Sequence, residues 1–164
     1  MMTTDSAATA TPRNAMLHQA IPEDIPFIKS MVDAAYSIYV ERIGRPPAPM
    51  CEDWEETIQS HNVLVLKDND QVVGSITFHV DEESDSLKID NLVVHPAIQG
   101  RGYGRFLIDH AESEARRRAL PGVSLFTNAK MTENIGLYKR LGFSETERRV
   151  EDGFQRVYFH KKLV

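Results

Sequence analysis

The stretch LVVHPAIQGRGYGR, residues 92–105, decides the fold prediction. It begins as an apolar strand, passes through a turn containing Gly100, Gly102 and Gly104, and enters a segment with the apolar spacing of a helix. Glycine lets the backbone turn tightly and approach a ligand closely. The first N–H groups of a helix lack intrahelical partners and carry partial positive charge. This strand–turn–helix unit therefore suits an anion such as a phosphate, to which Arg101 and Arg105 can add charge-assisted bonds.

Two common nucleotide sites fit this turn poorly. No Gly-Lys-Ser/Thr follows it, as a P-loop requires. The glycines at 100, 102 and 104 also differ from the G-x-G-x-x-G spacing of the dinucleotide-binding fold. Nucleotide binding through this turn stays an alternative hypothesis. It predicts that ATP or NAD competes for the same site.

Outward from this stretch, the sequence predicts strands and helices in a mixed order. Strands are expected at 17–21, 63–66, 72–80, 87–94, 123–127, 143–150 and 154–163, and helices at 22–44, 52–60, 103–119 and 133–141. Adjacent strands, together with strands separated by helices, indicate one α+β (mixed α/β) domain with a largely antiparallel sheet and helices on its faces. We expect this domain at 16–164, after a disordered leader at 1–15 that lacks the features of a secretory signal.

Composition excludes several function classes. The chain has 164 residues and a formal net charge of −5, which argues against a dedicated nucleic-acid binder. No apolar run is long enough to cross a membrane, so a cytoplasmic protein is expected. A single cysteine and six histidines without ligand spacing predict no metal site.

Two segments resemble motifs of the GCN5-related N-acetyltransferase (GNAT) family. Gln99, Gly102 and Gly104 match the Gln/Arg-x-x-Gly-x-Gly/Ala core of motif A, after a similar Leu-x-Val-x-Pro strand. Residues 134–143, NIGLYKRLGF, are similar to motif B, which ends in Leu-Tyr-x-x-Leu-Gly-Phe. The resemblance spans the chain from about residue 17 to 163 and implies a GNAT-like fold, a twisted, mostly antiparallel sheet of about seven strands flanked by about four helices.

The resemblance implies an N-acetyltransferase that moves an acetyl group from acetyl-CoA to a primary amine of a small molecule. The strand ending at Val94 would splay from its neighbour, which frees backbone groups for the pantetheine chain and the thioester carbonyl. The pyrophosphate would lie on the glycine turn. The implied cofactor-binding residues are Leu92, Val93, Val94, Gln99, Gly100, Arg101, Gly102, Tyr103, Gly104, Arg105, Asn134 and Tyr138.

Two proton transfers accompany this reaction. Tyr138 matches the family's general acid for the departing thiolate, with a core tyrosine as the alternative. Asp90 is the catalytic candidate on the acceptor side, either as a base or as a residue that orients a cationic substrate, and a solvent-facing role is the alternative. His79 and a water molecule are further candidates for the base. Lys88 stands where the histone-acetylating branch has glutamate, which argues against that mechanism.

Asn134 is a departure from the family pattern. The usual CoA-contacting asparagine falls seven residues before the tyrosine, where this chain has Met131. Asn134 can either bond pantetheine or only begin the helix.

Acceptor recognition is expected in the first two helices and their loop. Aromatic and acidic side chains there suit an ammonium ligand. The substrate-binding candidates are Tyr36, Tyr39, Glu41, Trp54 and, on a strand, His79. A structural role for Tyr39 and Trp54 is the alternative. An acyl-CoA sensor without turnover, a protein or peptide N-acetyltransferase, and a homodimer through the last hairpin all stay open.

Overall fold

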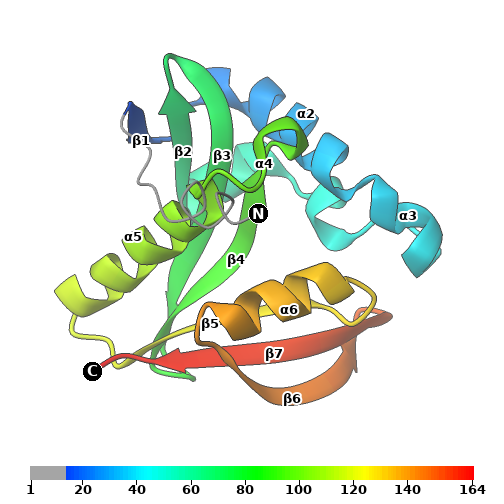
Figure 1. Ribbon diagram of the computed structural model, residues 1–164, viewed down its shortest axis with the longest axis vertical. Helices are drawn as coiled ribbons and strands as arrows, with labels where there is room; N and C mark the ends of the chain where they lie inside the picture. The colour runs from blue at the N-terminus through cyan, green and yellow to red at the C-terminus, as the bar shows by residue number, and fades with distance from the viewer. Residues whose placement is uncertain (1–13) are drawn as a thin grey trace, which may run out of the picture.

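Seven strands form one sheet in the computed structural model, which describes residues 14–164. The strands are β1 (Ala15–Gln19), β2 (Asn62–Asp68), β3 (Gln71–Asp81), β4 (Ser86–Val94), β5 (Gly122–Asn128), β6 (Ser144–Glu151) and β7 (Phe154–Lys162). Their order is β1-β2-β3-β4-β5-β7-β6, and only β4 and β5 pair in parallel (Figure 1). The predicted α+β class with a mostly antiparallel sheet is confirmed.

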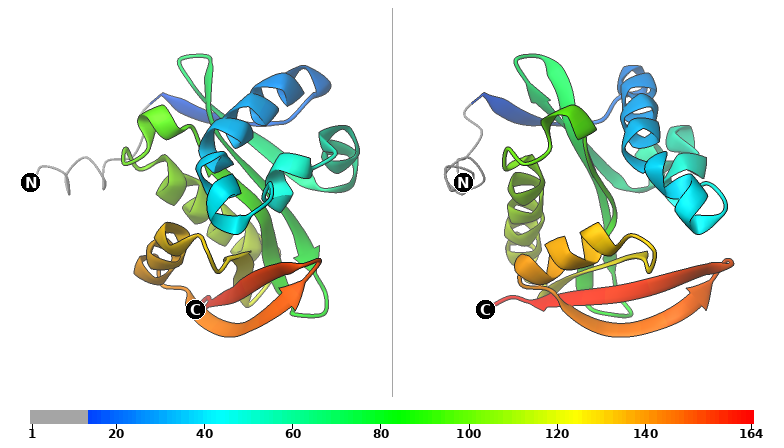
Figure 2. Two further views of the ribbon diagram at one scale, coloured as in Figure 1. Left: turned by 90° about the vertical axis from the view of Figure 1, so that its right-hand side faces the viewer. Right: turned by 45° about the vertical axis from the view of Figure 1, so that its right-hand side comes forward.

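The helices form a layer on each face of the sheet. They are α2 (Ile25–Tyr36), α3 (Ile38–Ile43), α4 (Trp54–Ser60), α5 (Tyr103–Arg117) and α6 (Thr132–Arg140). Residues of α5 and α6 share one buried apolar cluster with the strands, and residues of α2 and α4 share a second cluster on the other face. Figure 2 shows α5 and α2 on opposite sides of the sheet. The buried stripe Ile25, Ile28 and Val32 on α2 has the predicted helical spacing.

The first helix and the first strand differ from their predicted bounds. The first helix is divided at Ser37, because Val40 N–H donates to the Ser37 carbonyl and the regular spacing of helical bonds is interrupted there. Tyr39 therefore lies in α3. Ala15, assigned to the leader, is the first residue of β1 and pairs with Asp68. The rest of the predicted leader, residues 1–13, lies outside the described residues.

The contact between β4 and β5 is short, and this opens the sheet. The two strands pair only from Leu87 to Ile89 on β4 and from Val123 to Leu125 on β5. On the other side of β4, Phe78 pairs with Ile89 while Thr77 pairs with Asn91, so Asp90 is the extra residue of a β-bulge. A bulge bends its strand and increases the local twist. Residues 90–94 of β4 and 126–128 of β5 therefore form no backbone hydrogen bonds with each other and face an opening. The expected separation of β4 from its neighbour is present.

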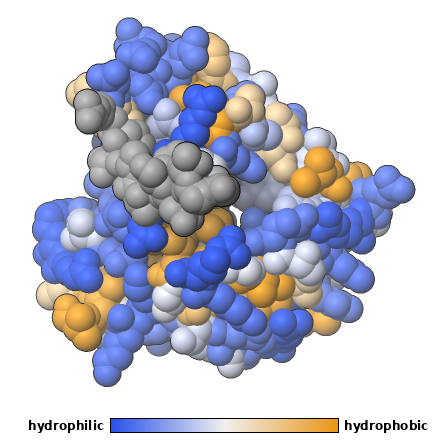
Figure 3. Space-filling view, in the orientation of Figure 1, coloured by the Kyte–Doolittle hydropathy of each residue, from blue (hydrophilic) through white to orange (hydrophobic). Residues whose placement is uncertain are grey.

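Within residues 14–164, no helix is long and apolar enough to cross a membrane. Figure 3 shows that hydrophilic residues cover most of one face, with separate hydrophobic patches. At the edge of the sheet, β6 is exposed along nearly its whole length and carries charges of both signs. Charged edge strands resist pairing with other chains. The homodimer through the last hairpin stays a prediction.

Candidate active site

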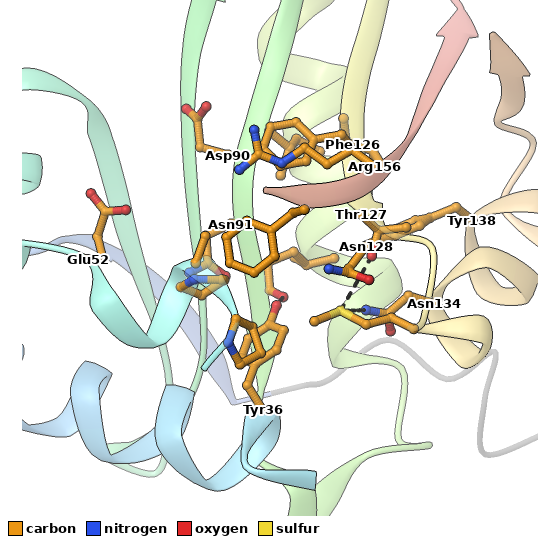
Figure 4. Close-up of a pocket in the computed structure, with 18 residues that line it drawn as sticks. Tyr36, Glu52, Asp90, Asn91, Phe126, Thr127, Asn128, Asn134, Tyr138 and Arg156 are labelled. Carbon is orange, nitrogen blue, oxygen red and sulfur yellow. Dashed lines mark hydrogen bonds between the residues drawn. The ribbon is translucent and has the colours of Figure 1, made fainter. Parts of the chain in front are cut away.

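A cavity of about 230 Å³ lies where β4 and β5 separate (Figure 4). Its wall is formed by the two separated strands, together with parts of α2, α6, β7 and the loop after α3. The lining residues are Tyr36, Pro47, Ala48, Pro49, Glu52, Ile89, Asp90, Asn91, Leu92, Leu125, Phe126, Thr127, Asn128, Met131, Asn134, Tyr138, Phe154 and Arg156. The cavity thus combines aromatic surface with two carboxylates and one guanidinium group.

Tyr138 lies in the cavity wall on α6. Its side chain is buried, with its ring centre 5.9 Å from the ring centres of both Phe143 and Phe159. Burial raises the pKa of the Tyr138 phenol to about 12, because the charged phenolate is poorly solvated there. The phenol is therefore protonated at neutral pH and can act as a proton donor.

Tyr36 links α2 to the separated part of β4. Its hydroxyl donates a hydrogen bond to the Leu92 carbonyl oxygen over 3.2 Å. Burial raises the pKa of this phenol far above its usual value, so the hydroxyl stays a donor. Tyr36 is the only one of the predicted acceptor-binding residues that lines the cavity.

The bulge on β4 brings Asp90 into the cavity wall. Asp90 Oδ2 lies 2.6 Å from Nδ1 of His79 on the neighbouring strand β3. His79 does not line the cavity itself and reaches it only through this carboxylate. Asp90 and His79, separate candidates in the sequence, are one hydrogen-bonded pair.

The glycine turn follows β4 directly. Gly100 and Gly102 have φ angles of 86° and 89°, which lie in the left-handed region that favours glycine. The Gln99 side-chain amide donates to the Val94 carbonyl over 3.3 Å and holds the turn against the strand end. The first helical bond of α5 runs from Phe106 N–H to the Gly102 carbonyl. The N–H groups of residues 103–105 therefore precede the helical bonding and are available to a ligand.

The side chains of the turn divide into two kinds. Arg101 and Arg105 are exposed. The Tyr103 side chain is buried and its hydroxyl donates to the Asp68 carboxylate, so only the backbone of Tyr103 belongs to the turn. The turn does not line the cavity, but Leu92 in the wall and Val94 at the turn belong to the same strand.

The other predicted acceptor residues lie away from the cavity. Trp54 is 2% exposed and belongs to the apolar cluster beneath α2. Tyr39 is buried, and the Arg42 guanidinium carbon lies 5.0 Å from its ring centre. Glu41 is exposed, and none of the three lines the cavity. Asn134 does line it, and its side-chain amide donates to the Met131 sulfur over 3.6 Å.

The cavity residues of β5 and β7 are not among the candidates that the sequence motifs indicate. Phe126 and Asn128 lie two positions apart on β5. Asn128 pairs with Arg156 of β7. The Arg156 guanidinium carbon lies 4.4 Å from the Phe126 ring centre, and Nη1 lies 3.2 Å from Glu151 and 3.6 Å from Asp152. The period-two spacing of Phe126 and Asn128 could have placed both on one face, but only the pairing of β5 with β7 brings Arg156 there.

Two arginines connect the N-terminal side of the cavity to its C-terminal side. Arg42 of α3 forms an ion pair of 2.7 Å with Glu133 of α6 and donates to the Lys130 carbonyl over 3.1 Å. The guanidinium group of Arg45 bonds the Asp152 carbonyl, and its carbon lies 3.7 Å from the Phe154 ring centre. These contacts join α3 and the loop after it to α6 and to the turn before β7.

Glu133→Gln should lower the urea midpoint of unfolding slightly at neutral pH. The Arg42 guanidinium lowers the pKa of Glu133 from 4.5 to about 2, so its stabilising effect is full above pH 4.5 and is lost as pH falls through about 2. Because the pair is exposed, the effect is small and weakens with salt. Urea titrations of both proteins at pH 7 and near pH 2 measure it. A difference that persists at the lower pH would contradict the pairing.

The fold and the cavity between separated strands define an acetyltransferase architecture. Residues 28–143 match the model of the acetyltransferase (GNAT) family. The chain belongs to this family of acyltransferases.

Curated relatives differ in their acceptors. The chain is 32% identical over 101 residues to a mycothiol acetyltransferase of Jonesia denitrificans, covering 62% of this chain and 32% of the relative. It is 32% identical over 95 residues to the peptidyl-lysine N-acetyltransferase YjaB of Salmonella typhimurium, covering 58% of each chain. The chain thus spans about a third and just over half of these two relatives.

Solved structures share the fold. The crystal structure of PaiA N-acetyltransferase from Thermoplasma acidophilum in complex with coenzyme A has a TM-score of 0.74, with 14% identity, over 92% of this chain and 100% of that one. At this identity the likeness supports the fold alone.

Proposed function

We propose that the protein transfers an acetyl group from acetyl-CoA to a primary amine of a small molecule. One observation carries the proposal. The unpaired part of β4 runs from a left-handed glycine turn at the start of α5 to a cavity lined by a buried, protonated tyrosine, Tyr138. An anionic cofactor with a long amide-containing arm fits such a path.

In this proposal, acetyl-CoA lies along β4. Its pyrophosphate contacts the N–H groups of residues 103–105 and the side chains of Arg101 and Arg105. Its pantetheine arm bonds the free backbone groups of residues 92–94 on the side facing the opening. Asn134 in the cavity wall is placed to bond the end of that arm. The family membership and a similar fold crystallised with coenzyme A support this cofactor.

The chemistry follows from three groups around the cavity. The acceptor nitrogen attacks the thioester carbonyl carbon, and a backbone N–H of β4 stabilises the negative charge that grows on the carbonyl oxygen. The carbon–sulfur bond then breaks, and the Tyr138 hydroxyl donates its proton to the departing sulfur. Asp90 accepts the proton that the amine loses. The products are the N-acetylated amine and coenzyme A.

The cavity supports a small cationic acceptor. Tyr36, Phe126 and Phe154 offer aromatic surface, and Asp90 and Glu52 add negative charge to the lining, which together suit an ammonium group. At about 230 Å³, the cavity is below the ~300–1,000 Å³ of pockets that hold drug-sized ligands.

Steady-state release of coenzyme A with a panel of acceptors tests the proposal. The panel contains small diamines and amino sugars, a lysine peptide, a peptide with a free N-terminus and a sample without acceptor. We expect turnover with a small amine above the rate without acceptor. Binding of acetyl-CoA without turnover would favour a sensor, and turnover only with peptides would favour a peptide acetyltransferase. Displacement of coenzyme A by ATP or NAD would contradict the cofactor.

Asp90→Asn should lower kcat by about 100-fold, because an amide cannot accept the amine proton. The affinity for coenzyme A should stay unchanged, since the Asp90 carboxylate contacts His79 and no residue of the glycine turn. Asp85→Asn in the exposed turn before β4 is the matched control and should behave as wild type. Wild-type kcat in Asp90→Asn would remove Asp90 from the mechanism.

Three broader statements belong to the same proposal. Residues 16–164 act as a single acetyltransferase domain, with the strand residue Ala15 now included. We expect the protein in the cytoplasm, where acetyl-CoA is available. We expect the reaction itself to need no metal.

A further inference from the structure

Three potential metal ligands meet beside the cavity. They are His61 directly before β2, His79 on β3 and Asp90 at the bulge of β4. His79 Nδ1 lies 2.6 Å and His61 Nε2 lies 4.0 Å from Asp90 Oδ2, and the candidate ligand atoms all lie within 4.8 Å of one another. The two imidazole rings stand nearly perpendicular, with centres 5.2 Å apart.

The contacts of Ser60 orient His61 within this cluster. Ser60 Oγ donates to the Glu56 carbonyl over 3.2 Å, so its lone pair accepts from Nδ1–H of His61 over 2.8 Å. This tautomer leaves Nε2 with a lone pair directed at the Asp90 carboxylate. Nε2 and the carboxylate are then two acceptors, and either a proton on Nε2 or a metal ion between them resolves the arrangement. An outer hydrogen bond that fixes the ring and the tautomer is a regular feature of histidines that bind metals.

We propose that His61 Nε2, His79 Nδ1 and an Asp90 oxygen bind one Zn²⁺ ion. Imidazole nitrogen and carboxylate oxygen are zinc ligands, and three protein ligands leave a fourth position for water. When the nitrogen–zinc bond forms at Nδ1, the neutral His79 ring carries its one proton on Nε2 instead, so the ring stays neutral and no net proton is released. The three side chains are 33%, 35% and 28% exposed, which leaves a path for the ion.

The sequence predicted no metal because its histidines have no local ligand spacing. The cluster depends on the pairing of β3 with β4 and on the bulge at Asp90. His79 lies opposite Lys88 in the register, and the extra residue at the bulge brings the Asp90 carboxylate to His79.

Zinc at this site has a consequence that rests on the proposed function. Asp90 belongs to both the metal cluster and the cavity wall. A carboxylate that binds zinc cannot accept a proton from the acceptor amine. Bound zinc should therefore inhibit acetyl transfer reversibly, and a chelator should restore the rate.

Zinc titration of the metal-free protein tests the site without any substrate. The protein is treated with EDTA, exchanged into buffer and titrated with Zn²⁺ against a chromophoric chelator. We expect one equivalent bound, and Co²⁺ in its place should give the visible absorption of a tetrahedral ion. Ser60→Ala should weaken the affinity about tenfold, and His61→Ala on the order of 100-fold.

The control replaces a histidine elsewhere in the fold. His110→Ala on α5, which packs on the opposite face of the sheet, should bind zinc as wild type does. Thermal unfolding of His61→Ala and of the more conservative His61→Gln, both without zinc, checks that the fold is retained. Equal zinc affinity in wild type and His61→Gln, or no bound equivalent in wild type, would overturn the site.

The inhibitory consequence has its own readout. His61 lies outside the cavity lining, so His61→Gln should retain basal transfer and lose the inhibition by zinc. Zinc that binds wild type without slowing transfer would overturn the inhibitory role. Absence of transfer in metal-free wild type would count against the proposed function, while the titration would still decide the metal site.

Discussion

Tyr138→Phe should lower the rate of acetyl transfer by about 10³-fold and leave the affinity for coenzyme A unchanged. The substitution removes the hydroxyl that, in the proposed reaction, donates a proton to the departing sulfur. It keeps the aromatic ring that packs against Phe143 and Phe159. Because the pKa of Tyr138 is raised to about 12, the wild-type phenol carries its proton throughout the neutral range. Single-turnover rates and equilibrium binding of coenzyme A separate the two effects.

Tyr158→Phe is the matched control for this substitution. Tyr158 lies on β7 with its ring centre 5.4 Å from that of Phe126, and it does not line the cavity. The same atom is removed there, so the rate should stay near that of wild type. The thermal midpoints of both variants show whether packing is retained. An unchanged rate in Tyr138→Phe would make Tyr138 a core residue and leave the thiolate to depart without its help.

The sequence predicts the strand, the glycine turn and the following helix well because this unit is local. The strand, the glycine turn and the start of α5 are contiguous, and the left-handed angles at Gly100 and Gly102 are a property of residue type. Tyr138 is likewise found through the short segment around it. No long-range pairing is needed to bring these groups to one end of β4.

The rest of the cavity wall depends on long-range packing, which no local sequence pattern predicts. Trp54 was a substrate candidate, but as a large apolar side chain at the start of α4 it is buried in the core. Arg156 reaches the cavity only because β7 pairs with β5 and stacks its guanidinium group on Phe126. The bulge at Asp90 inserts one residue into β4, which no local pattern in the strand indicates. This extra residue allows Asp90 to contact both the cavity and His79.

Gly102→Val should raise the Kd for coenzyme A by about 100-fold or more. Gly102 is the residue before α5, with φ 89° and ψ 2°, and its conformation directs the free N–H groups of residues 103–105 outward. Valine disfavours this conformation, and its branched side chain occupies the space beside those groups where a pyrophosphate would lie. Loss of two hydrogen bonds to a charged group, at about 1.5 kcal/mol each, corresponds to about a 100-fold rise in Kd. Isothermal titration with coenzyme A measures the change.

Gly44→Val controls for the backbone strain. Gly44 follows α3 with φ 95° and ψ 0°, nearly the same conformation, and a Cβ atom there meets nothing within 4 Å. Valine at either position costs about 1–2 kcal/mol of stability for the left-handed conformation. The two variants should therefore unfold at similar urea concentrations, while only Gly102→Val loses coenzyme A. If both variants bound coenzyme A as tightly as wild type, backbone strain would be the only effect of the substitution. The pyrophosphate would then have to lie elsewhere than on the turn from Gln99 to Arg105.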